Sequence, residues 1–112
     1  MSEKLMTQTQ WTQLCDNVVR ACASQHSQRA YRASSSMYRA WVARTKLIFL
    51  SKATVLRYRD YLLLTKKLAP KSINLHLTVL RRLAQEGIAE QVLEPSTALA
   101  ILRIPRVPNR GV

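Results

Sequence analysis

The chain has 112 residues, with 18 lysines and arginines against 6 acidic residues, which gives a formal net charge of +12. An apolar content of 47% suits a single globular domain with a modest core rather than a disordered tail. No apolar run approaches the roughly 20 residues of a membrane-spanning helix, and the first residues lack the apolar core of a signal peptide. We therefore expect a cytoplasmic protein with no membrane partner.

The basic residues are concentrated in the middle of the chain. Fourteen lysines and arginines lie between Arg20 and Arg82, and only Asp60 opposes them. A folded domain with this imbalance is expected to bind a polyanion, through phosphate contacts that weaken as salt rises. The alternative is a solvated basic surface, which is the common role of isolated lysines and arginines. The fourteen-to-one ratio favours nucleic-acid binding.

The N-terminal third predicts one helix after a flexible stretch. Residues 1–6 show no pattern, and we expect them to be frayed. Over residues 7–23 the apolar positions recur at helical spacing, at Trp11, Leu14, Cys15, Val18, Val19 and Cys22. The two cysteines are two turns apart, about 10 Å, which is too far for a disulfide. They are predicted to be small buried hydrophobes. The two cysteines and two histidines lack ligand spacing, so no metal or other cofactor is expected.

A second helix is predicted from Ser27, acting as N-cap, to about Arg44, after a break at residues 24–26. Its apolar side carries Tyr31, Tyr38, Trp41 and Val42. The three serines at 34–36 are poor helix formers. Two interpretations remain open: they form a surface for close approach to a phosphate backbone, or strong packing makes them tolerable in the helix.

Residues 45–51 are predicted to form a loop, and a third helix should follow from Lys52 to about Thr65 with Ser51 as its N-cap. Its apolar positions include Val55, Leu62 and Leu63. Lysines at 66 and 67 lie where cations complement a helix dipole. That placement gives the two lysines a structural role, so they are not assigned to DNA.

The fourth predicted helix, residues 70–86, has two contrasting faces. Its apolar stripe is Ile73, Leu77, Leu80, Leu83 and Ala84, whereas Ser72, Thr78, Arg81 and Arg82 lie off the stripe. Pro70 suits the first turn, and Gly87 is placed to end the helix. Such a helix packs by one side and can contact DNA with the other.

A short fifth helix is predicted after Pro95. Residues 104–112 contain two prolines, two arginines and a glycine, and they are interpreted as an extended basic linker toward a domain absent from this chain. The folded domain should then cover residues 7–103. No segment alternates as a strand would, so the fold class is predicted to be all-α with four or five helices.

Several motifs occur together in the order found in one protein family. Ser27 is followed by aromatic residues at offsets of four (Tyr31), eleven (Tyr38) and fourteen (Trp41). A second motif spans residues 68–77, and Gly87, Pro95 and an Ile-Pro pair at 104–105 follow it. The ordered set resembles the tyrosine recombinases, also called phage integrases, over about residues 8–112. Glu94 is a departure, since many members carry asparagine before the proline.

The resemblance implies a SAM-like helical bundle, the N-terminal core-binding domain of such a recombinase. This domain forms one half of a clamp around the recombination site. The catalytic half, with the tyrosine nucleophile, has no counterpart in this chain. We therefore expect the chain to bind double-stranded DNA without cleaving it, alongside other recombinase subunits, and to be monomeric when isolated. The first helix either completes the chain's own core or docks on a neighbouring subunit.

The candidate DNA-binding residues combine the resemblance with the basic face of the fourth helix. They are Ser27, Arg29, Ala30, Arg32, Ala33 and Ser34 in the second helix, and Lys71, Ser72, Asn74, Leu75, Thr78, Arg81 and Arg82 in the fourth. Val79 neighbours the groove-facing positions that the family uses.

The resemblance implies roles for four of these residues. Lys71 would contact a phosphate or a purine edge, and Ser72 would cap the helix and contact a phosphate. Asn74 would read an adenine edge. Leu75 stands where another member of the family carries a polar residue, so the sequence specificity should differ there. His76 is interpreted as a structural histidine rather than a base contact.

Two other functions fit the charge and size. One is a free-standing helical protein that binds RNA, and the other is a protein-interaction module. The ordered motifs weigh against the first and the basic excess against the second. An independent enzyme is not expected, because the six acidic residues are scattered and form no pair for acid–base chemistry.

Overall fold

The computed structural model describes residues 5–43, 48 and 50–108. Within these ranges the protein is all-helical, as predicted, and contains no strand, only an isolated backbone bridge between Met6 and Ile48. The elements are α1 (Gln8–Arg20), α2 (Gln25–Val42), α3 (Lys52–Asp60), the π-helical turn η1 (Tyr61–Thr65), α4 (Pro70–Ala89) and α5 (Pro95–Leu102). The predicted helix end at Arg44, most of the predicted loop at 45–51 and the predicted linker after residue 108 lie outside the described residues.

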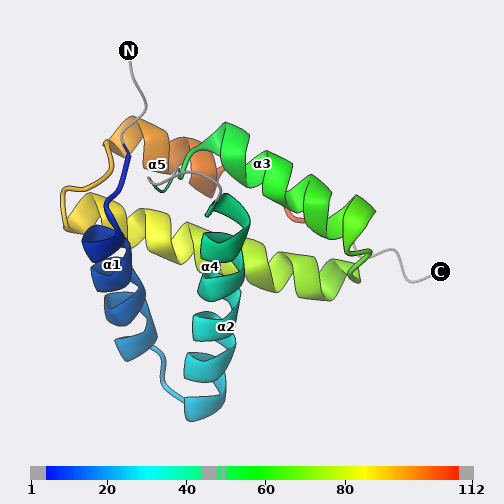
Figure 1. Ribbon diagram of the computed structural model, residues 1–112, viewed down its shortest axis with the longest axis horizontal. Coiled ribbons are helices and arrows are strands. Elements are labelled where there is room, and N and C mark those ends of the chain that lie inside the picture. Colours follow the sequence, from blue (N-terminus) through cyan, green and yellow to red (C-terminus); the bar gives the residue numbers. More distant parts are fainter. Residues whose placement is uncertain (1–4, 44–47, 49, 109–112) are drawn as a thin grey trace.

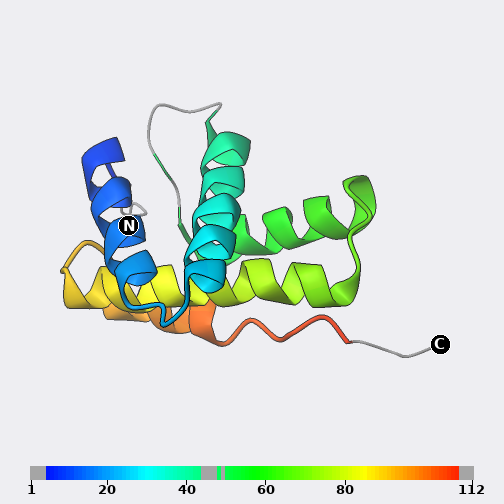
Figure 2. The same cartoon turned by 90° about the horizontal axis from the view of Figure 1, so that it is seen from below.

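The long helix α4 is the centre of the fold, and α1, α2, α3 and α5 all contact it. Helices α1 and α2 form a pair that crosses α4, while α3 runs on to the turn from which α4 begins (Figure 1). Helix α5 lies against the C-terminal half of α4. The chain after α5 continues beside α4 toward its N-terminal end (Figure 2).

Three helices begin at hydroxyl N-caps. The side chains of Thr7, Ser24 and Ser51 accept hydrogen bonds from backbone N–H groups three residues ahead. Ser51 was predicted as an N-cap and is confirmed. The prediction of Ser27 as an N-cap is wrong, because Ser24 performs that role and accepts from the Ser27 N–H. Helix α2 therefore begins at Gln25, inside the break predicted at residues 24–26.

The first helix packs inside this chain. Trp11, Leu14 and Val18 of α1 are buried in the core, and α1 contacts both α2 and α4. Met6 differs from the prediction that residues 1–6 fray, because its side chain is fully buried and its backbone exchanges two hydrogen bonds with Ile48. A large apolar side chain next to a helix start gains more from burial than a frayed end gains in entropy.

An aromatic cluster joins the first three helices. Trp11 of α1 stacks on Tyr38 of α2 with ring centroids 5.7 Å apart. Tyr38 in turn meets Tyr58 of α3 edge-on at 5.0 Å, and Trp41 of α2 lies 5.1 Å from Tyr58. Tyr61 of η1 completes the aromatic cluster. Aromatic pairs in these geometries stabilise by about 0.5–1.5 kcal/mol beyond their buried area.

The apolar stripe of α4 is buried as predicted, but the helix does not end at Gly87. It continues to Ala89, and the chain reverses at Gln91, whose φ is 59°. Gly87 lies where Leu93 folds back on the helix: a Cβ at this position would be 2.7 Å from the Leu93 Cδ1. Its carbonyl accepts hydrogen bonds from the N–H groups of Val92 and Leu93. The glycine therefore allows Leu93 to approach the helix closely, and it does not end the helix.

Candidate nucleic-acid interface

An open groove lies along the outer face of α4, near its N-terminal end. It is lined by Lys71, Ser72, Asn74, Leu75, Thr78 and Arg106, and we call it the α4 groove. Lys71, Leu75 and Thr78 recur at intervals of four and three residues, so they form a single stripe on the helix. Arg82 extends the stripe by one more turn. At about 100° per residue, this stripe is diametrically opposite the buried Leu80.

One flank of the stripe is occupied by the C-terminal segment, residues 103–108. The Asn74 Nδ2 donates to the Val107 carbonyl at 2.9 Å, and the Asn74 Oδ1 accepts from the Val107 N–H at 2.7 Å. Asn74 is only 7% exposed, and both ends of its amide are engaged. In this structure it is therefore not available to read an adenine edge, and the predicted role is corrected to that of a clamp on the backbone.

Arg81 holds the same segment two helical turns further along. Its guanidinium donates to the Ile104 carbonyl. Burial lowers the pKa of Arg81, and the positive charge of Arg106 lowers it further. Ile104 is buried and Val107 packs on the core. The C-terminal segment thus has no helix or strand, as expected, but it differs from the predicted linker in being docked over residues 104–107.

The hydrogen bonds of Asn74 and Arg81 to this segment bring Arg106 into the α4 groove, where the side chain is exposed near Lys71. Arg106 was absent from the candidate residues, because the sequence shows no partner for the segment that carries it. The available signal was the pair of apolar residues at 104 and 107 among the prolines. Apolar residues in an otherwise polar extended segment indicate docking.

The N-terminal end of α4 adds a positive potential to the groove. Its N-cap is Ala69, Pro70 is the first helical residue, and no side chain caps the helix. Ser72 is exposed in the first turn and does not cap, contrary to the prediction. The uncapped N–H groups of a first turn favour anions. The predicted contact of Ser72 with a phosphate remains a prediction.

Helix α2 lies along the opposite flank of the stripe. The Ser34 Oγ and the His76 Nδ1 form a hydrogen bond of 2.6 Å between α2 and α4. Ser34 is 4% exposed and is therefore not a surface residue, which corrects its predicted contact with DNA. Ser35 is also buried and donates to carbonyls of its own helix, whereas Ser36 is exposed. Packing thus explains the first two serines of the triplet.

The other predicted residues of α2 remain at or near the surface. Arg29 and Ala33 are exposed, and Ser27 and Ala30 are half-buried. In α4, Val79 is buried and does not face the groove. Arg29 and Ala33 therefore remain accessible on α2, whereas Val79 is covered.

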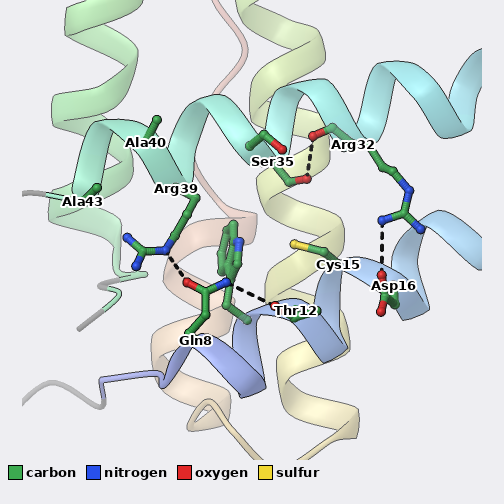
Figure 3. A pocket seen from close by; sticks show the side chains of 11 residues that line it. Gln8, Thr12, Cys15, Asp16, Arg32, Ser35, Arg39, Ala40 and Ala43 are labelled. Carbon is green, nitrogen blue, oxygen red and sulfur yellow. Dashed lines mark hydrogen bonds and ion pairs between the residues drawn. The ribbon is translucent and has the colours of Figure 1, made fainter. Parts of the chain in front are cut away.

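Arg32 points toward α1 instead of the groove. Its Nη1 lies 3.1 Å from the Asp16 Oδ1, and the two side chains are 58% and 41% exposed, respectively (Figure 3). Arg39 also reaches α1, where its Nε donates to the Gln8 Oε1 at 2.7 Å (Figure 3). An exposed ion pair contributes less than about 1 kcal/mol. The Arg32–Asp16 pair can therefore exchange for a phosphate at little cost.

Burial controls the pKa of Cys15 and of His76. It raises the pKa of the Cys15 thiol to about 11, which keeps the thiol protonated. It lowers the pKa of His76 from 6.5. Cys15 is thus a buried hydrophobe, and His76 has the environment predicted for a structural histidine.

Lowering the pH should destabilise the protein through His76. The unfolded chain takes up a proton near pH 6.5 while the folded imidazole stays neutral to lower pH, so the unfolded state holds more protons as the pH falls. Thermal melts between about pH 7 and pH 5 should show a falling Tm that His76→Gln flattens. His26→Gln, which replaces the exposed histidine, is the control and should retain the fall. An equal fall in His76→Gln would contradict the assignment.

Among the described residues, no cluster of three or more histidine, cysteine or acidic side chains has the arrangement to hold a metal ion. Within the same residues no helix has the length and apolar content that crossing a membrane requires. Comparisons with protein-family models, with curated proteins and with solved structures find no match for this chain.

Proposed function

We propose that this chain is a duplex-DNA-binding domain, the SAM-like core-binding part of a tyrosine recombinase. The observation that carries the proposal is the α4 groove. Lys71 and Arg106 project there beside the uncapped start of a long helix, and none of the described residues that line it is acidic. Cations and a helix N-terminus at one surface are suited to phosphate.

The shape of this surface favours duplex DNA over duplex RNA. The stripe is a single row of side chains along one face of a 20-residue helix. The major groove of B-DNA is about 12 Å wide and admits an α-helix, whereas the major groove of A-form RNA is too narrow for side chains to read. Phosphate contacts by Lys71 and Arg106 would then position α4 against the base edges.

We propose binding without cleavage. Tyr38 and Tyr58 are fully buried in the aromatic cluster, and Tyr31 and Tyr61 pack against the core. Burial raises the pKa of Tyr58 and disfavours its phenolate. This packing supports the proposal that none of these tyrosines acts as a nucleophile. The breaking and rejoining of DNA would belong to a catalytic domain outside this chain.

Titration of a labelled DNA duplex at several salt concentrations tests the proposal. We expect weak binding with low sequence discrimination, with a Kd of about the 10⁻⁴–10⁻⁶ M typical of non-specific complexes at physiological salt, and a steep loss of affinity as salt rises. An RNA duplex of the same sequence should compete poorly. No binding at low salt, affinity independent of salt, or a preference for the RNA duplex would overturn the proposed function.

A further inference from the structure

Leu75 is an apolar side chain in the middle of a basic groove. It is 39% exposed and lies between Lys71, one turn before it, and Thr78, one turn after it, with Arg106 also lining the groove. Three other large apolar side chains in the described part of the chain are at least as exposed, namely Leu63, Leu64 and Leu99. None of those three lines the α4 groove.

A surface that bound only phosphates would have no use for a leucine at this position. Phosphate oxygens are contacted by charged, hydroxyl and amide groups, and an exposed apolar side chain adds nothing to them. In the major groove of DNA, one base feature is apolar: the C5-methyl group of thymine, which apolar side chains contact. Lys71 would place a phosphate about one helical turn, roughly 6 Å along the axis, from Leu75.

We propose that Leu75 is a specificity-determining residue that packs against the C5-methyl group of a thymine and makes the domain prefer thymine at one position of its site. The inference rests on the proposed function. A protein partner fits this position poorly, because covering Leu75 would also bury the charges of Lys71 and Arg106. A DNA duplex supplies the phosphates that these cations need at the same time as the methyl group.

Selection from a pool of random DNA duplexes, followed by sequencing of the bound fraction, provides the first measurement. The native protein should enrich thymine at one position, and Leu75→Ala should lose that enrichment. Leu75→Met retains an apolar side chain and should preserve it. Leu99→Ala, which truncates an exposed leucine outside the groove, is the matched control and should select as the native protein does.

Replacing that thymine with deoxyuridine in the selected duplex removes only the methyl group. The native protein should then bind about fourfold more weakly, the factor expected for one buried methyl group. Leu75→Ala should bind the two duplexes equally. A melting curve of Leu75→Ala should match that of the native protein, because the side chain is partly exposed and outside the core.

The outcomes separate the two proposals. If the native protein binds DNA with the expected salt dependence but shows no thymine preference, or Leu75→Ala keeps that preference, the role of Leu75 is overturned and DNA binding stands. Equal binding of the thymine and deoxyuridine duplexes by the native protein overturns it in the same way. If no duplex binds at low salt, the proposed function fails and the role of Leu75 fails with it.

Discussion

The double variant Lys71→Ala, Arg106→Ala should bind duplex DNA with a salt dependence about two units shallower in log Kd against log salt, because each lost phosphate contact removes about 0.9 unit. Its affinity at low salt should also fall. Both side chains are exposed, so the Tm should remain close to that of the native protein. Titrations at four or more salt concentrations, paired with melting curves, measure both quantities.

A control with the same loss of charge shows whether the effect is local. Lys52→Ala, Arg57→Ala removes two exposed cations from α3, outside the α4 groove. It should change the slope by less than the groove variant does. If the two double variants behave alike, DNA binding follows net charge alone, and the α4 groove is not the interface.

The second large effect concerns stability. Leu80→Ala should lower the free energy of unfolding by about 2–5 kcal/mol, the range for a buried leucine truncated in a core, since Leu80 is 1% exposed. Leu64→Ala makes the same chemical change at a side chain that is 69% exposed, and should stay within about 0.5 kcal/mol of the native protein. Chemical denaturation of both variants provides the test. A Leu80→Ala variant as stable as Leu64→Ala would show that the buried face of α4 is misassigned.

Local patterns predicted the helices well, because each is an amphipathic segment with its own start signal. Helical spacing of apolar residues identified the buried stripe of α4, including Leu77 and Leu80, and the serine at 51 marked the start of α3. Two serines three residues apart, Ser24 and Ser27, are candidate caps for α2, and the sequence does not show that Ser24 is the one that accepts the bond. Gly87 shows the same ambiguity, since a glycine inside a helix and a glycine that ends one look alike until the fold-back of Leu93 is known.

The details of the groove depend on contacts between distant parts of the chain. Asn74 is a plausible base-reading residue by chemical type, but its amide is occupied by Val107, which lies 33 residues further along. Ser34 is likewise removed from the surface by His76, which is 42 residues away. Arg106 enters the groove because its segment is held against α4 by Asn74, by Arg81 and by the buried Ile104. Helical spacing identifies the face of α4 that is exposed, whereas these pairings determine which of its polar residues remain free.

The aromatic cluster has an optical consequence. The chain contains two tryptophans, Trp11 and Trp41, and both belong to the aromatic cluster. Trp11 probes the contact of α1 with α2, and Trp41 probes the contact of α2 with α3. Their emission during denaturation therefore distinguishes one cooperative transition from an early detachment of α1, because only Trp11 would change its environment when that helix leaves. The protein carries its own reporter for whether α1 is an integral part of the folded unit.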